Sequence, residues 1–171
     1  MISLVCALAL SAAPHQLTSV HAALKPLRDA YPSRVDTQKL FLAAVEGAAR
    51  VEPLIVTTRF DETLLVSVTT ETMTFELGGI TTLSKMHSTL EAFVAFVERA
   101  LEQQKAKPNV RTLELAMLAG LLRSLEDRHS RLVEPNEARQ GHALEDGVCV
   151  SRFALAGELA MKLVVRRELC R

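Results

Sequence analysis

Residues 54–77 read LIVTTRFDETLLVSVTTETMTFEL and contain three short runs in which apolar residues recur at every second position. The alternating positions are Leu54, Val56 and Thr58, then Leu64, Val66 and Val68, then Met73, Phe75 and Leu77. This period is typical of half-buried strands, and the polar breaks at residues 61–62 and 70–71 are short enough for hairpins. The stretch therefore predicts a three-stranded antiparallel meander, closed by Gly78 and Gly79.

Helical patterns precede this meander. Residues 17–30 predict a short helix that is interrupted at Pro26 and ends at Tyr31-Pro32. Asp36 is expected to cap a second helix that Pro53 ends. The apolar positions of this second helix recur at helical spacing as Leu40, Phe41, Ala44, Val45 and Ala48.

Two longer helical patterns follow the meander. Thr82 or Ser84 can cap the first of them. Its apolar stripe consists of Leu83, Met86, Leu90, Phe93, Val94, Val97 and Leu101, and such a stripe is typical of core packing. A polar linker at residues 103–109 leads to a helix at 110–125 that is apolar on most sides and is expected to be the most buried element. Together these patterns predict a mostly helical α+β fold with a small sheet.

The composition limits the classes of function. A chain of 171 residues has room for one domain with a core, or for one domain and a fragment of a second. Lys and Arg number 20, as do Asp and Glu, so the overall field attracts neither nucleic acid nor anionic lipid. We therefore expect no nucleic-acid partner.

The amino-terminal residues 2–13 form an apolar run that is too short to span a bilayer but suits a secretory signal. Small residues at Ala9 and Ser11 provide a cleavage site, although no basic residue follows Met1. Residues 1–13 are thus expected to act as a signal, and the protein is expected to be exported to the periplasm or cell envelope. The alternative is a buried first helix or strand.

Neither a disulfide framework nor a metal centre is expected from the cysteines. Cys6 lies in the signal-like segment, so Cys149 and Cys170 form the only possible pair. The spacing of Cys and His residues does not match a zinc site. No cofactor is expected either, because Gly78-Gly79 is not followed by the Lys-Ser or Lys-Thr pair of a phosphate-binding loop.

At the carboxyl end, residues 141–147 are expected to form a linker, and residues 148–169 two strands around Ala156-Gly157-Glu158. A lone hairpin is marginally stable in water. We therefore expect residues 147–171 either to be poorly ordered or to mediate self-association.

Residues 113–135, which read LELAMLAGLLRSLEDRHSRLVEP, resemble a segment of C-terminal-processing, or tail-specific, serine peptidases that lies just ahead of their PDZ domain. Residues 36–49 are similar to a short helix of that family that begins with a Val-Asp pair. Residues 147–165 (GVCVSRFALAGELAMKLVV) are similar to the first hairpin of the PDZ domain. The resemblance implies a non-catalytic pre-PDZ region at residues 14–140 and an incomplete PDZ-like hairpin with its linker at 141–171.

The sequence departs from the family pattern at two places. The Leu-Asp-Pro-His-Ser motif is replaced by LEDRHS at residues 125–130, which has an additional residue and no proline. The glycine-rich run that opens the PDZ domain is replaced by HALEDG at residues 142–147, which puts binding of a peptide carboxylate in doubt. The catalytic serine and lysine of the family have no counterpart in this chain.

Several side chains were weighed as catalytic groups. Asp127, His129 and Ser130 invite a triad interpretation, but neighbours in sequence rarely converge on one point, and these residues are better explained as helix-end groups. The carboxylates of Glu145 and Asp146 are typical of a solvated loop.

A Ser/Lys dyad of Lys85 and Ser88 would require burial of the lysine, and its neighbours are polar. His87 is expected on the solvated face of the same helix. No catalytic, cofactor-binding or metal-binding residue is therefore assigned.

The sequence leaves two functions open. The chain is either the N-terminal portion of an exported peptidase-like protein, where it positions a PDZ domain or mediates oligomer contacts, or a stand-alone exported interaction module with a protein or peptide partner. A product without selected activity is a third possibility. The first interpretation is preferred because of the resemblance.

Overall fold

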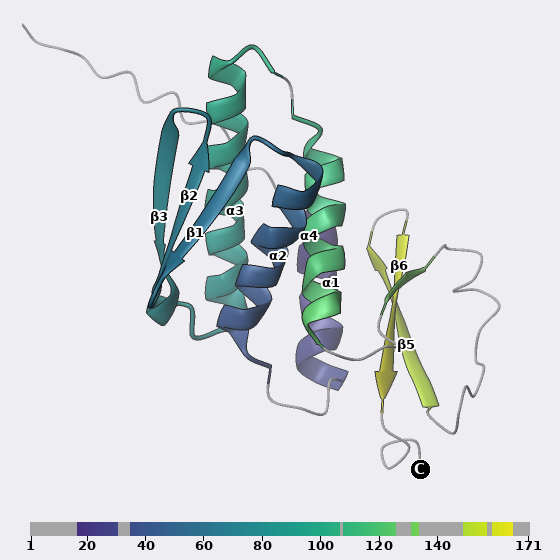
Figure 1. Ribbon diagram of the computed structural model, residues 1–171. Coiled ribbons are helices and arrows are strands. Elements are labelled where there is room, and N and C mark those ends of the chain that lie inside the picture. Colours follow the sequence, from purple (N-terminus) through teal and green to yellow (C-terminus); the bar gives the residue numbers. More distant parts are fainter. Residues whose placement is uncertain are drawn as a thin grey trace, which may run out of the picture.

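The computed structural model describes residues 17–30, 35–106, 108–125, 131–133, 149–156 and 159–165. These residues form a mostly helical α+β fold, as the sequence predicts (Figure 1). The elements in chain order are α1 (Thr18–Ala30), α2 (Thr37–Val51), β1 (Ile55–Phe60), β2 (Thr63–Val68), β3 (Glu71–Glu76), the 3-10 turn η1 (Leu77–Gly79), α3 (Leu83–Gln103), α4 (Val110–Ser124), β4 (Arg131–Val133), β5 (Cys149–Ala156) and β6 (Leu159–Val165).

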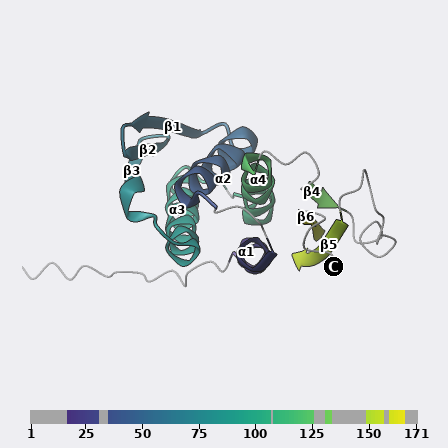
Figure 2. The same ribbon diagram turned by 90° about the horizontal axis from the view of Figure 1, so that it is seen from below.

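The elements are arranged in layers. The sheet β1-β2-β3 lies against α2 and α3, and α4 and α1 lie on the far side of these two helices (Figure 2). The second sheet, with strand order β4-β6-β5, lies beside α1 and α4. The helices are thus enclosed between two small antiparallel sheets.

The predicted three-stranded meander is confirmed, but the residues predicted to form the buried face of its first strand are wrong. Leu54 and Val56 were expected on the buried face, yet they are 44% and 57% exposed, whereas Ile55 is 4% exposed. The reason is the register, because Ile55 lies opposite Val68 of β2 and cross-strand partners point to the same side of a sheet. The buried set in β2 agrees with the prediction.

The two hairpin turns place their first residue in the left-handed region. Asp61 has a φ of 47° and Thr69 a φ of 55°. The second turn is therefore Thr69-Thr70, one residue before the predicted break, and β3 begins at Glu71. A β-branched residue such as Thr69 is strained in this conformation, whereas aspartate tolerates it.

Side chains begin three of the helices as the capping rules require. The Oδ1 of Asp36 accepts hydrogen bonds from the backbone N–H groups of Gln38 and Lys39, each at 3.0 Å. Thr82, rather than Ser84, caps α3 because its Oγ1 accepts from the N–H of residue 85 at 3.1 Å. Asn109 caps α4 through an equivalent bond of 3.1 Å to the N–H of residue 112.

The helix α1 is not interrupted at Pro26, as the sequence had suggested. It runs without a break over Thr18–Ala30. Proline removes one backbone hydrogen bond and costs about 3 kcal/mol in a helix interior. Burial of the apolar face offsets this cost, since Val20, Ala23, Leu24 and Leu27 are all buried.

Three phenylalanines join the first sheet to the helices. The ring centroids of Phe41 (α2) and Phe75 (β3) are 5.6 Å apart, and those of Phe75 and Phe93 (α3) are 6.3 Å apart. Tilted and edge-to-face contacts at these distances are favourable beyond the buried area alone. This cluster fixes the meander on the α2–α3 layer.

The helix α4 buries one face completely and the other only in part. Met117, Leu118, Leu121 and Leu122 are buried, whereas Leu115 and Ala116 are half-buried. Only Thr112 and Arg123 of α4 are exposed, which agrees with the expectation that this helix is the most buried of the described helices.

The helices α2 and α4 approach each other most closely at Gly47 and Gly120. A Cβ atom added to Gly47 would lie 3.0 Å from the carbonyl carbon of Ala116, and one added to Gly120 would lie 3.0 Å from that of Ala43. Real Cβ atoms rarely approach a carbon this closely. Glycine is thus required at both positions because the facing backbone occupies the space of a side chain.

The predicted carboxyl-terminal hairpin is described as β5 and β6, and it does not stand alone. β4 pairs antiparallel with β6 through Arg131–Lys162, Leu132–Met161 and Val133–Ala160. This third strand was missed because its three residues are too few to show alternation. β4 lies within the segment 14–140 that was assigned to the helical domain, so backbone pairing links this segment to the hairpin.

Candidate functional site

Several residues considered at the sequence level lie outside the described part of the chain. They are Asp127, His129, Ser130, Glu145, Asp146, Cys6 and Cys170, together with the signal-like residues 1–13 and the linker 141–147. Their roles stay predictions.

Lys85 and Ser88 do not form a dyad. The Ser88 hydroxyl donates a hydrogen bond to the backbone carbonyl oxygen of Lys85 at 2.9 Å, and both residues are exposed. The hydroxyl is therefore bound to its own helix, and the lysine lacks the burial that would activate it.

His87 was expected on a solvated face, but the structure places it between α1 and α3. Its side chain is 16% exposed and its ring packs edge-on against that of His21, with centroids 5.1 Å apart. His87 Nδ1 lies 3.7 Å from Glu91 Oε2, while its Nε2 is buried and has no hydrogen-bond partner. The difference arises because α1 covers this part of α3, which the local pattern of α3 does not reveal.

The two histidines and Glu91 line a cavity of about 440 Å³ with Leu17 and Thr18. Within the described ranges, no three or more His, Cys, Asp or Glu side chains are grouped so that they could hold a metal ion. The two histidine rings form an edge-on contact between α1 and α3.

A buried carboxylate joins α4 to the start of α1. Glu114 is 5% exposed, and its Oε1 accepts hydrogen bonds from the N–H groups of Ser19 at 2.5 Å and Val20 at 3.3 Å. Arg111 Nη1 donates to Glu114 Oε2 at 3.1 Å and to Ser19 Oγ at 2.5 Å. Because the first N–H groups of a helix have no partner within it, Glu114 acts as a cap supplied by another helix. Its role here is structural.

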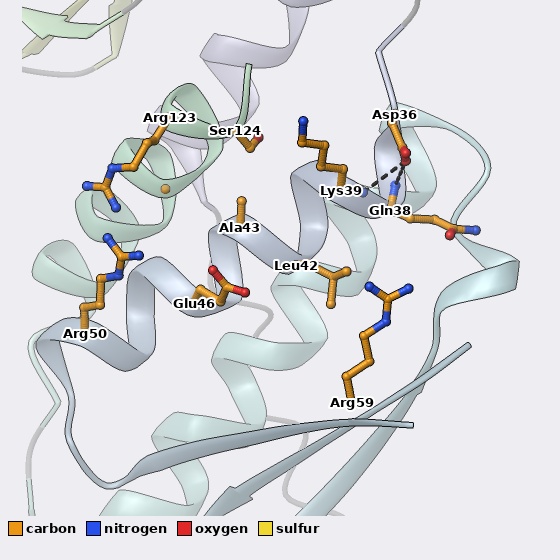
Figure 3. A pocket seen from close by; sticks show the side chains of 11 residues that line it. Asp36, Gln38, Lys39, Leu42, Ala43, Glu46, Arg50, Arg59, Arg123 and Ser124 are labelled. Carbon is orange, nitrogen blue, oxygen red and sulfur yellow. Dashed lines mark hydrogen bonds between the residues drawn. The ribbon is translucent and has the colours of Figure 1, made fainter. Parts of the chain in front are cut away.

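The strongest candidate for a binding site is a groove over the outer face of α2 (Figure 3). Its volume is about 470 Å³. The lining comes from three elements: Gln38, Lys39, Leu42, Ala43, Glu46 and Arg50 of α2 with its cap Asp36, Arg59 of β1, and Gly120, Arg123 and Ser124 of α4.

Positive charge predominates in this groove. Four cationic side chains, Lys39, Arg50, Arg59 and Arg123, face two carboxylates. One of these, Asp36, is engaged in capping α2. Arg59 donates from Nε to the backbone carbonyl oxygen of residue 61 at 3.1 Å. Among the described residues, Arg50 and Arg123 form no ion pair, which leaves their guanidinium groups available to a ligand.

Sequence reasoning missed both features. Arg50, Arg59 and Arg123 are spread over more than 70 positions in the chain and meet only through tertiary packing. The sequence did contain one indication of the role of Glu114. It is a charged residue in a strongly apolar helix, and a buried charge needs a partner, so a long-range contact of this carboxylate could have been predicted.

Comparison with models of known protein families, with curated proteins and with solved structures found no match. In the described residues, no helix combines the length and the apolar character needed to cross a membrane.

Proposed function

We propose that this chain is a non-catalytic N-terminal portion of an exported protein similar to C-terminal-processing serine peptidases. In this role its helical domain positions a PDZ domain or provides contacts between subunits. The proposal assigns no catalytic residue, cofactor or metal to the chain.

The pairing of β4 with β6 carries this proposal. The segment that resembles the pre-PDZ region, residues 113–135, contains most of α4 and all of β4. The hairpin that resembles the start of a PDZ domain contains β6, and β4 pairs with it over three residues. α1 also contacts β5 and β6. A ladder of backbone hydrogen bonds and a helix contact are suitable means of holding a following domain in a fixed orientation.

Two experiments test the proposal. Sequencing of the transcript through the codon for Arg171 should reveal a continuation into PDZ and peptidase segments, and a stop codon there would contradict it. The purified chain should not cleave an unstructured peptide with an apolar carboxyl end, because no serine in the described part of the chain has a base positioned to activate it. Turnover that disappears in Ser130→Ala would refute the non-catalytic assignment.

The groove over α2 favours a second candidate, a stand-alone exported interaction module. Arg50 and Arg123 form no ion pair with another described residue, and protein interfaces are enriched in arginine. Both candidates require export, which predicts that the mature protein recovered from the cell envelope lacks Met1. Full-length protein confined to the cytosol would contradict this.

A further inference from the structure

The groove over α2 has the length of a short peptide. From Gln38 to Arg50 the helix rises about 18 Å, at about 1.5 Å per residue. An extended chain covers this distance with about five or six residues, at about 3.3 Å each. The floor between the charged groups is formed by Ala43 and Gly120, which present little bulk, and by the half-buried side chain of Leu42. A backbone could therefore lie close to α2.

The charges are arranged in a pattern along the groove. Arg50 and Arg123 lie at one end, Arg59 and Lys39 lie toward the other with the capping carboxylate of Asp36, and Glu46 lies between them (Figure 3). α2 and α4 run antiparallel, so Arg50 and Arg123 start from opposite ends of the helix pair, and their side chains extend toward the same part of the groove (Figure 3). Guanidinium groups bind carboxylates through two parallel hydrogen bonds, which gives direction as well as attraction.

The central carboxylate distinguishes between anionic partners. A nucleic acid carries charge at every nucleotide and would place a phosphate against Glu46. A peptide can instead present acidic residues at its two ends and neutral residues in the middle. The net charge of the chain is zero, so it offers no general attraction for a polyanion.

We propose that this groove binds an extended polypeptide segment with acidic residues at both ends and a neutral centre. The proposal rests on the groove alone and goes beyond the peptidase assignment, which could fail without affecting it.

The test uses the full chain and two fluorescein-labelled peptides of about six residues, matched to the length of the groove. Both contain the same Glu, Gly and Ser residues, but one is acidic at its ends and the other at its centre. Fluorescence anisotropy should show that the end-acidic peptide binds at least about threefold more tightly than the centre-acidic peptide. The reason is that the centre-acidic peptide places its carboxylates against the carboxylate of Glu46. Binding should weaken as NaCl is raised from about 50 mM to about 500 mM.

Charge variants locate the site. Arg50→Glu combined with Arg123→Glu should weaken binding by about tenfold or more, since each reversal replaces an attraction with a repulsion. Arg99→Glu reverses one charge at an exposed position of α3 outside the groove, as each single variant Arg50→Glu or Arg123→Glu does inside it, and should alter binding less than about twofold. Glu46→Gln should tighten binding of the centre-acidic peptide, a gain that unfolding cannot produce. Circular dichroism should show that each variant keeps its helix content.

Three results would overturn the proposal. The first is no binding of the end-acidic peptide, or equal binding of the two peptides. The second is tighter binding of a single-stranded oligonucleotide of similar length, which would assign the groove to nucleic acid. The third is an equal loss of binding in the Arg99→Glu control.

Discussion

Replacement of Gly47 by alanine should destabilise the protein although alanine is the better helix former. The added Cβ would lie 3.0 Å from the carbonyl carbon of Ala116 and 3.4 Å from the Cα of Gly120. The carbonyl oxygen of Ala116 lies closer still to the added Cβ, and carbon atoms prefer separations of about 3.5–4.0 Å, so α2 and α4 must move apart by at least roughly 0.5–1 Å. The obstacle is backbone of the facing helix and cannot rotate away.

The magnitude follows from two opposing effects. Overpacking of this kind costs about 1–3 kcal/mol, and the rigid backbone places this site at the upper end of that range. The higher helix propensity of alanine returns about 1 kcal/mol. The free energy of unfolding should therefore fall by about 2 kcal/mol, which lowers the Tm by about 4–8 °C for a chain of this size.

The assay is thermal and urea unfolding followed by circular dichroism. Gly79→Ala is the matched control, because no atom lies within 4 Å of its added Cβ, and it should change stability by less than about 0.5 kcal/mol. Gly120→Ala should resemble Gly47→Ala, and the double variant should lose less than the sum, since one separation of the helices accommodates both methyl groups. A Gly47→Ala protein as stable as the parent would refute this account of the α2–α4 contact.

Three further changes test other parts of the fold. Glu114→Ala should lower the free energy of unfolding by about 1–3 kcal/mol because the start of α1 loses its cap. Glu114→Gln keeps a hydrogen-bond acceptor and should lower it less. Equal losses of stability in urea melts would show that the cap is unimportant. Thr69→Gly should raise the free energy of unfolding by about 0.5–1 kcal/mol, because glycine adopts the left-handed conformation without strain. Asp61→Gly should raise it less, and a lower Tm for Thr69→Gly than for the parent protein would show that Thr69 is not strained. Leu118→Ala should cost about 2–5 kcal/mol through the cavity it leaves, against less than about 0.5 kcal/mol for the exposed Glu102→Ala, and similar small effects would mean that the core has been misplaced.

Local patterns predicted the elements of the fold well where one physical effect dominated. Asp36 and Thr82 begin their helices because a side-chain oxygen at that position satisfies N–H groups that nothing else can reach. In β2 the polar residues Thr63 and Ser67 share one phase of the strand, which places Leu64, Val66 and Val68 together on the other, buried face.

The predictions failed where the local sequence was compatible with two structures and only contacts with distant segments selected one of them. Leu54, Ile55 and Val56 are all apolar, so alternation could begin on either phase, and only pairing with β2 selects Ile55 as the buried residue. Pro26 predicted an interruption that tertiary packing of α1 overrides. The His21–His87 contact depends likewise on packing between distant segments.

The close approach of α2 and α4 also determines the geometry of the groove. Ala43 and Gly120 face each other across this approach and form part of the groove floor. Arg50 and Arg123 extend from these two antiparallel helices, one from each, so their separation changes when the helices move apart. A methyl group at Gly47 that moves the helices apart should therefore lower stability and weaken peptide binding together, whereas charge reversal at the arginines should weaken binding with little loss of stability. Binding that persists unchanged in Gly47→Ala would show that the two guanidinium groups act independently of each other.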